Sequence, residues 1–316
     1  MTTVIKIIFI IVDIIFILLL TFIYDITSNV PFKGIINVPQ GSATKIIAHF
    51  SKQNLNATPL DPRILSYIGI PQSGYIDLGN KDLTKIDFFY KLTTAKPDMV
   101  DITLIPGETT IMFLKELSKT KDLNLTILES EYNATAPFYE GFLIPETYHM
   151  ARGLNEKSII SNLVKTSDEI HKNLAKEAGI KSKIEWLKVI SKASVIQKEA
   201  ADVSEMSIVS SVIDNRIKLG MKLQMDGTLN YGEFSHQRVT PERIRNDTTK
   251  FNTYIYEGLP QSPVCTVSTE AIKAALNPAQ TKYLYFMRDI QTGKHVFTKT
   301  LKEHNEQVRI QRNLKK

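Results

Sequence analysis

A continuous apolar segment, residues 7–24, constrains the fold of this 316-residue chain more than any other feature. It consists mainly of Ile, Leu and Phe, and Asp13 is its one acidic or basic side chain. A helix rises 1.5 Å per residue, so a helix of this length approaches the roughly 30 Å of a bilayer's hydrocarbon core. Lipid offers the backbone no hydrogen bonds, and a helix satisfies them internally. The sequence therefore predicts a transmembrane helix at residues 7–24, followed by a globular remainder.

The flanks of this segment bear on its role and its orientation. A secretory signal peptide is the alternative, but the run is long for one and no Ala-x-Ala type of cleavage site follows Tyr24. Lys6 precedes the run and Asp25 follows it, which favours an amino terminus inside the cell. We expect a cytoplasmic tail at residues 1–6 and an extracytoplasmic remainder. Asp13 either contacts a partner helix, or is protonated or shallow enough to reach the lipid headgroups.

Composition and charge exclude several classes of function. The net charge is +6, but Lys and Arg are spread along the chain without a nucleic-acid motif, so we expect no nucleic-acid partner. Cys265 is the only cysteine, so a disulfide within the chain and a thiolate zinc cluster are both excluded. The six histidines are not paired at ligand spacing, and a Gly-rich phosphate loop and a nucleophile elbow are missing from the sequence. We therefore predict a protein without metal or cofactor.

The region from 25 to 135 contains two similar short patterns. Residues 36–47 read as a strand, a Pro/Gly turn and a helix that starts at a hydroxyl residue, and residues 102–113 repeat this order. The two patterns resemble LysM-like modules, which precede the catalytic domain in one family of cell-wall enzymes and can bind glycan. The alternative is that a strand, a Pro/Gly turn and a helix in this order are common in any α+β domain. We expect a linker and a LysM-like region at residues 25–135.

A dense block of aromatic, carboxylate and turn residues, 138–148, opens the expected second domain, residues 136–316. Flat rings stack on sugar faces, and carboxylates accept hydrogen bonds from sugar hydroxyls. Glu140 and Tyr148 are therefore candidates for contact with a carbohydrate. Aromatic clusters are more often ordinary core, however, because large apolar rings are mostly buried for packing.

Periodic apolar residues predict helices at 158–178 and 182–201, followed by a third helix that is capped by Asp202 and stopped by Gly220. The short link between the last two helices makes an αα-hairpin that would hold the end of the second helix on a rigid frame. Asn215 and Arg216, near the far end of the third helix, could orient a carboxylate or simply cap the helix and face solvent.

Glu199 lies at the end of the second of these helices. A carboxyl group in a mostly apolar helix keeps its proton to higher pH, because burial disfavours the charged form, and can donate that proton as an acid. Glu199 nevertheless lies beside the apolar stripe, on a flank with Lys188 and Lys192, so a solvated face with ion pairs is the competing interpretation. Gln197 lies nearer the apolar stripe and needs an internal hydrogen-bond partner.

Many short motifs in order make the chain similar to the endolytic murein transglycosylase family, whose bacterial members are also called YceG-like. The resemblance runs from residue 140 to the C-terminus, and the apolar segment and the LysM-like region extend it weakly to the whole chain. The motifs that carry it are Glu140-Gly141, Thr147-Tyr148, Ser194 to Glu199, Asn215-Arg216, Leu223-Gln224, Asp226, Asn252-Thr253-Tyr254, Gly258-Leu259-Pro260, Pro278-Ala279 and Tyr283 to Phe286.

The resemblance implies cleavage of peptidoglycan strands between N-acetylmuramic acid and N-acetylglucosamine, without water, to leave 1,6-anhydromuramic acid ends. It implies Glu199 as catalytic residue, a bacterial inner (cytoplasmic) membrane location and work beside the wall polymerases, terminating new strands. One carboxylic acid can protonate the leaving oxygen and then take the proton of the sugar's C6 hydroxyl. A second catalytic carboxylate, which ordinary glycosidases use, is not required.

The remaining site residues form a predicted sugar site around Glu199. We expect the substrate to be bound by Gln224, Asp226, Asn252, Tyr254, Glu140 and Tyr148. Asp226 can also be read as a turn residue before Gly, and Asn252 and Tyr254 as a capped turn with a buried ring.

Four positions depart from the family pattern, and two other functions stay open. Gln197 stands where members often carry a second glutamate, Met225 and Gly227 replace the usual Thr and Pro, and Glu146 replaces Asp. The alternatives are a true hydrolase of glycan strands and a noncatalytic wall-binding scaffold. The predicted fold is α+β, with a transmembrane helix, a small LysM-like α/β subdomain and a mixed catalytic domain.

Overall fold

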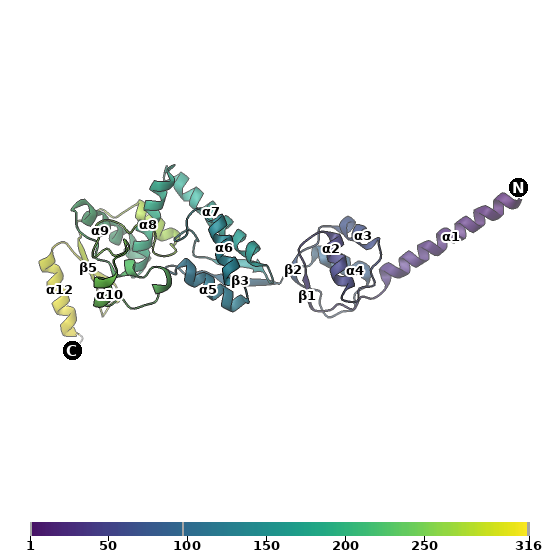
Figure 1. Cartoon of the computed structure of the whole chain (residues 1–316), viewed down its shortest axis with the longest axis horizontal. Helices are drawn as coiled ribbons and strands as arrows, with labels where there is room; N and C mark the ends of the chain where they lie inside the picture. The colour runs from purple at the N-terminus through teal and green to yellow at the C-terminus, as the bar shows by residue number, and fades with distance from the viewer. Residues whose placement is uncertain (1, 97, 315–316) are drawn as a thin grey trace. The chain divides into compact units, whose positions relative to one another are not determined.

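The computed structural model describes residues 2–96 and 98–314, which form two compact units. Unit 1 comprises Met1–Asp101 and His149–Leu154, and unit 2 comprises Ile102–Tyr148 and Asn155–Lys316. Helices and small two-stranded sheets occur in both parts of the chain (Figure 1). The predicted α+β class is confirmed.

The N-terminal helix α1, Thr2–Thr27, is longer than the predicted helix at residues 7–24 (Figure 1). Its segment Val4–Thr27 is long and apolar enough to cross a membrane by length and composition. The large apolar side chains of this segment, from Val4 to Tyr24, are exposed. Removing apolar surface from water is favourable, so apolar surroundings would stabilise this exposed segment.

Unit 1 contains β1 (Ile35–Val38), α2 (Ala43–Ser51), α3 (Asp61–Ile68), β2 (Gly74–Asp77) and α4 (Lys85–Thr94). β1 and β2 pair antiparallel, with Ile35 opposite Asp77. The rings of Phe32, Phe50 and Phe88 meet in the core with centroids 5.0–5.2 Å apart. The first predicted strand, turn and helix, at residues 36–47, are confirmed as β1 and α2.

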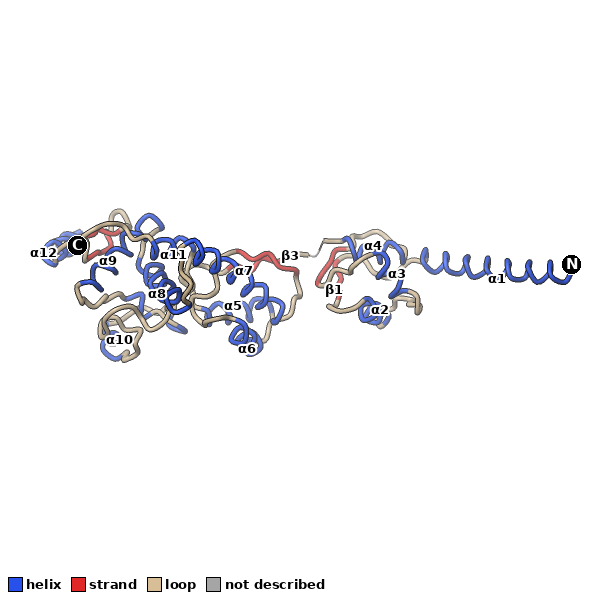
Figure 2. The backbone as a smooth tube through the Cα atoms, turned by 90° about the horizontal axis from the view of Figure 1, so that it is seen from above, coloured by secondary structure: helices blue, strands red, loops and turns tan. Residues whose placement is uncertain are grey.

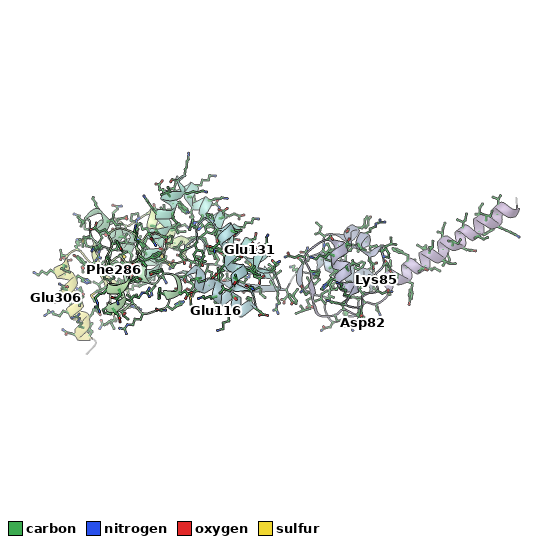
Figure 3. All side chains as sticks on the ribbon, viewed as in Figure 1. Asp82, Lys85, Glu116, Glu131, Phe286 and Glu306 are labelled. Carbon is green, nitrogen blue, oxygen red and sulfur yellow. The ribbon has the colours of Figure 1, made fainter. Side chains whose placement is uncertain are left out.

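A buried ion-pair cluster joins α1 to the rest of unit 1. The ammonium of Lys85 lies 2.7 Å from Asp25, near the end of α1, and 3.4 Å from Asp61, at the start of α3. Lys85 and Asp61 are almost completely buried, at 1 % and 0 % exposed. Figure 3 shows Lys85 in the part of unit 1 next to the end of α1. Because Asp25 belongs to α1, the cluster fixes the apolar helix to the folded unit that follows it.

The chain passes between the units through β3 (Met99–Thr103) and β4 (Thr147–Ala151), which pair with each other. Figure 2 shows β3 in red. The compact units divide near residue 101, whereas we expected a domain boundary near residue 135. Helices α5 (Thr110–Lys121) and α6 (Leu125–Thr135) account for the difference, because α6 packs on α7 (Glu156–Glu177) of unit 2. The second predicted strand-turn-helix, at residues 102–113, is confirmed as the end of β3 and the start of α5.

Unit 2 is mostly helical, with a C-terminal hairpin. Helix α8 (Lys183–Glu199) packs on α9 (Met206–Lys218) and α11 (Thr269–Leu276), and together they form the core of the unit. The side chain of Ser182 caps α8, as predicted. The remaining elements are the 3-10 turns η1 (Val203–Glu205), η2 (Asp226–Leu229) and η3 (Gly232–Phe234), helix α10 (Pro241–Asn246), strands β5 (Tyr285–Arg288) and β6 (His295–Thr298), and helix α12 (Leu301–Leu314).

Candidate active site

Glu199 is the last residue of α8, and the second half of this helix is buried on nearly every side. Ser191, Ala193, Ser194, Val195 and Ile196 are at most 4 % exposed, and Val195 shares the flank of Glu199. Lys192 on that flank is held by Asp214 at 2.7 Å and by the carbonyl of Ala275 at 3.1 Å. The competing interpretation of this flank holds in part: Lys188 is exposed and Lys192 makes an ion pair, whereas Val195 is buried and Glu199 is partly buried. Gln197 has the internal partner that we predicted, because its side-chain oxygen accepts the N–H of Ser268 at 3.1 Å.

The carboxyl of Glu199 is held by the backbone of Gly227 in η2. The Gly227 N–H donates to Oε1 of Glu199 at 2.8 Å. A Cβ at position 227 would lie 2.5 Å from Cβ of Lys198 and 2.8 Å from Oε1 of Glu199. Carbon atoms do not approach so closely, so the contact between η2 and the end of α8 depends on the missing side chain of Gly227.

The environment of Glu199 suits a group that must give up and regain a proton near neutral pH. Burial raises the pKa of Glu199 to about 7, although part of the side chain reaches solvent. The Gly227 hydrogen bond lowers this pKa, the charge of Asp226 raises it and the charge of Arg216 lowers it. Burial is the largest of these effects, so near neutral pH the protonated and ionised forms coexist.

Asp226 and Tyr254 form a polar pair next to Glu199. The Tyr254 hydroxyl donates to Oδ1 of Asp226 at 2.6 Å, and both Asp226 and Glu199 act on Tyr254 by charge. Burial and the Asp226 carboxylate raise the pKa of Tyr254, so its hydroxyl stays protonated and remains a donor. Asp226 is exposed and Tyr254 is partly exposed. Both groups are thus accessible to a ligand that approaches Glu199.

Gln224 precedes this pair on the same segment. Its side chain is exposed, its φ is +49°, and its N–H donates to the carbonyl of Thr253 at 3.1 Å. A positive φ is unusual for a residue with a side chain and marks a backbone held by its surroundings.

Asn252 and Tyr148 lie in the interior of unit 2. Asn252 is 0 % exposed, and its amide donates to the carbonyls of Ile244 and Asp247, while its oxygen accepts the N–H of Tyr254 at 3.0 Å. Tyr148 is 7 % exposed and donates to the carbonyl of Ile144. Asn252 therefore orders the turn that carries Tyr254, and Tyr148 packs in the core. The structure does not bring either side chain to the surface beside Glu199.

Glu140 is bound elsewhere in unit 2, where its side chain contacts Thr110, the first residue of α5. Its carboxyl accepts the N–H of Thr110 at 3.1 Å and the hydroxyl of Thr110 at 2.9 Å. Burial raises the pKa of Glu140 to about 7, and the positive charge of Lys198 lowers it. Glu140 is one of the residues that line a cavity of about 250 Å³, together with Phe138, Tyr139, Tyr231 and Phe251. Lys198, whose charge acts on Glu140, directly precedes Glu199 in α8.

Arg216 is a site residue that the sequence left undecided. Its charge acts on both Glu199 and Tyr254, and its side chain is buried at 8 % exposed. A signal for this burial was present, because Arg216 follows Met206, Val209 and Ile213 at helical spacing and so continues the apolar stripe of α9. The alternative that Arg216 faces solvent is wrong.

Comparisons with known proteins identify relatives of this chain. The profile of the YceG-like family matches residues 30–310. An endolytic murein transglycosylase of Bacillus subtilis is 29 % identical over 301 residues, which cover 86 % of this chain and 82 % of that protein. One from Streptococcus pneumoniae is 28 % identical over 176 residues, covering 54 % of this chain and 31 % of the relative.

A solved structure shows the same fold. The crystal structure of a yceG-like protein from Listeria monocytogenes superposes with a TM-score of 0.58, at 23 % sequence identity, over 86 % of this chain and 98 % of that one. Since the family profile covers most of the sequence, from unit 1 to helix α12, the chain belongs to the YceG-like family.

Proposed function

We propose that this protein is an endolytic peptidoglycan transglycosylase in which Glu199 acts first as acid and then as base. The observation that carries this proposal is the position of Glu199, which is held by the Gly227 N–H at the end of α8 with a pKa raised by burial to about 7. The similarity to curated murein transglycosylases supports the substrate class.

The reaction balances with one carboxyl group. Protonated Glu199 gives its proton to the glycosidic oxygen between N-acetylmuramic acid and N-acetylglucosamine, and the bond from C1 to that oxygen breaks. Carboxylate Glu199 then takes the proton of the C6 hydroxyl, and the C6 oxygen bonds to C1. The product ends in 1,6-anhydromuramic acid, Glu199 is protonated again, and water is not consumed.

The residues around Glu199 have separate roles in this proposal. Asp226 and Tyr254 bind sugar hydroxyls, and the negative charge of Asp226 stabilises the positive charge that develops at C1. Gln224 binds the strand beside them with its exposed amide. Asn252 acts indirectly, by holding the turn of Tyr254, and Tyr148 contributes packing.

Glu140 would bind a sugar further along the strand, in the aromatic cavity of about 250 Å³. Aromatic rings and a carboxyl group suit the apolar faces and hydroxyls of a sugar ring. An enzyme that cuts inside a strand must hold sugars on both sides of the bond, which is consistent with a second binding place.

We propose that α1 anchors the protein in the cytoplasmic membrane and that the rest of the chain is extracytoplasmic. The length and apolar character of Val4–Thr27 support an anchor. Unit 1 would be the LysM-like part, supported by the order β1, α2, α3, β2 and the antiparallel pairing of its two strands. An enzyme held at the membrane meets nascent strands close to the peptidoglycan polymerases, where it would terminate them.

Product analysis tests the function. Full-length protein in detergent is incubated with intact peptidoglycan, and the new strand ends are identified by mass spectrometry. We expect 1,6-anhydro ends from the parent protein and at least about a hundredfold lower rate from Glu199→Gln, the scale of a lost acid and base. Reducing muramic acid ends would establish a hydrolase instead, and an inactive parent that still binds peptidoglycan would establish a scaffold.

A further inference from the structure

Arg216 of α9 makes an unusual set of contacts for a buried cation. Its guanidinium donates to the carbonyl of Leu284 at 2.6 Å, to that of Leu223 at 2.5 Å and to that of Lys222 at 3.3 Å. The ring of Tyr285 lies under it, with its centroid 5.2 Å away. These partners are three backbone carbonyls and an aromatic ring, and none of the four is a carboxylate.

The charge of Arg216 is balanced differently from that of the ion-paired Lys192 on α8. Among residues 2–96 and 98–314, Arg216 forms no ion pair with a carboxylate within 4.0 Å, and Glu199 is the carboxyl whose charge acts on it. A buried charge is costly unless an opposite charge compensates it. When Glu199 is protonated, Arg216 has only dipoles around it, and when Glu199 ionises, Arg216 gains a counter-charge.

Arg216 also holds the segment that presents Gly227 to Glu199. The carbonyls of Lys222 and Leu223 begin this segment, and Gly227 ends it. Thr253 holds the middle from another side, because its carbonyl and hydroxyl accept the N–H groups of Gln224 and Met225, both at 3.1 Å. The position of the Gly227 N–H therefore depends on two attachments, Arg216 and Thr253.

We propose that Arg216 is a positioning residue for the transglycosylase reaction, which fixes residues 222–227 against Glu199 and serves as the counter-charge of Glu199 in the base half of the cycle. This inference rests on the proposed function. The other charged or titratable groups near this pair are Asp226 of η2 and Tyr254, which act on Glu199 or are acted on by it, and Tyr285 and His304, which interact electrostatically with Arg216.

Two substitutions separate the charge from the attachment. Arg216→Met removes both, and we expect kcat to fall at least about tenfold because the segment is no longer held. The cation favours ionised Glu199, so without it the pH above which activity is lost should move upward. Arg216→Lys keeps a charge but loses the planar guanidinium that reaches three carbonyls. We therefore expect a similar fall in kcat, and a smaller shift of the pH profile than in Arg216→Met. Arg309→Met, on the exposed surface of α12, is the control and should change neither quantity.

A titration that needs no activity distinguishes this inference from the proposed function. The carboxyl carbon of Glu199 is followed by NMR in protein labelled at Glu, with Glu199→Gln used to assign the signal and Trp186 fluorescence used to verify that unit 2 is folded. We expect the pKa of Glu199 to be higher in Arg216→Met than in the parent. An unchanged Glu199 titration in a folded Arg216→Met protein would overturn the counter-charge role. If Arg216→Met does not fold, full activity of Arg216→Lys with an unchanged pH profile would overturn the positioning role.

Discussion

The backbone N–H of Gly227 lies 2.8 Å from Oε1 of Glu199, although the two residues are 28 positions apart in the chain. In a protonated carboxyl, one oxygen carries the proton and the other is the better acceptor. Because Gly227 occupies Oε1, the acid proton of Glu199 belongs on Oε2. The hydrogen bond thus leaves one defined oxygen to donate to the substrate.

Replacing Gly227 by Ala should damage activity more than stability. The added Cβ would lie 2.8 Å from Oε1 of Glu199 and 2.5 Å from Cβ of Lys198, so η2 must move away from α8. A displacement of about 1 Å in a catalytic group can cost about a hundredfold in rate, and we expect a loss between tenfold and a hundredfold in the release of anhydro products. Gly69→Ala in unit 1, where the Cβ meets Thr93 at 3.3 Å, is the control. Equal activity of the two variants would show that the Gly227 contact is dispensable.

Glu199→Gln should stabilise unit 2 at high pH while it lowers the rate of the reaction. Burial raises the pKa of Glu199 from 4.5 to about 7, so the folded state binds the proton more tightly than the unfolded state. The stability that this proton contributes is fully present below pH 4.5 and is lost as pH rises through about 7. The amide of Gln has no such loss. The shift in pKa sets an upper bound of roughly 3 kcal/mol on this loss of stability, and solvent access to the carboxyl makes the actual loss smaller.

Urea unfolding followed by the fluorescence of Trp186, the only tryptophan, measures this effect. We expect the advantage of Glu199→Gln in unfolding free energy to be larger at about pH 8 than at about pH 5. Glu140, whose pKa is also raised to about 7, is present in both proteins and cancels in the difference. An advantage that is the same at both pH values would mean that the carboxyl is not desolvated.

The helices that carry this site were predictable because their signals are local. Ser182 and Asp202 both act as caps, and the apolar periodicity of α8 and α9 follows from the sequence alone. The burial of Val195 was not predictable, because α9 and α11 cover α8 from segments further along the chain. In the same way, the N–H of Gly107 donates to the carbonyl of Thr266, a contact between distant segments that the local pattern at residues 102–113 does not reveal.

Tyr254→Phe should lower activity without unfolding the protein. The change removes the 2.6 Å hydrogen bond from the Tyr254 hydroxyl to Asp226, so the Asp226 carboxylate next to Glu199 loses one donor. A hydrogen bond to a charged group contributes about 1.5–3 kcal/mol, so we expect kcat/KM to fall by about tenfold to a hundredfold. Tyr256→Phe is the matched control, because its hydroxyl donates to the carbonyl of Thr248 at 3.0 Å. Equal effects of the two variants would argue against a role of the Tyr254 hydroxyl at the site.

Lys85→Met should destabilise unit 1 and leave unit 2 unchanged. The substitution removes the cation that lies 2.7 Å from Asp25 and 3.4 Å from Asp61, and Asp61 is 0 % exposed. Breaking a buried pair by removing one partner costs about 3–5 kcal/mol, because a buried charge is left uncompensated. Lys33→Met is the control, since its pair with Asp82 is exposed, at 52 % and 70 %, and such pairs contribute about 1 kcal/mol or less.

Calorimetry of the full-length protein in detergent measures both units, and the fluorescence of Trp186 follows unit 2 alone. We expect Lys85→Met to lower the unfolding temperature of unit 1, which is the transition that Trp186 fluorescence does not report. Lys33→Met should leave the stability of both units within about 1 kcal/mol of the parent. Because Asp25 belongs to α1, the loss should also free this helix from unit 1, and protease cleavage between residues 27 and 35 should become faster. A Lys85→Met protein as stable and as resistant to protease as Lys33→Met would contradict the role of this cluster in joining α1 to unit 1.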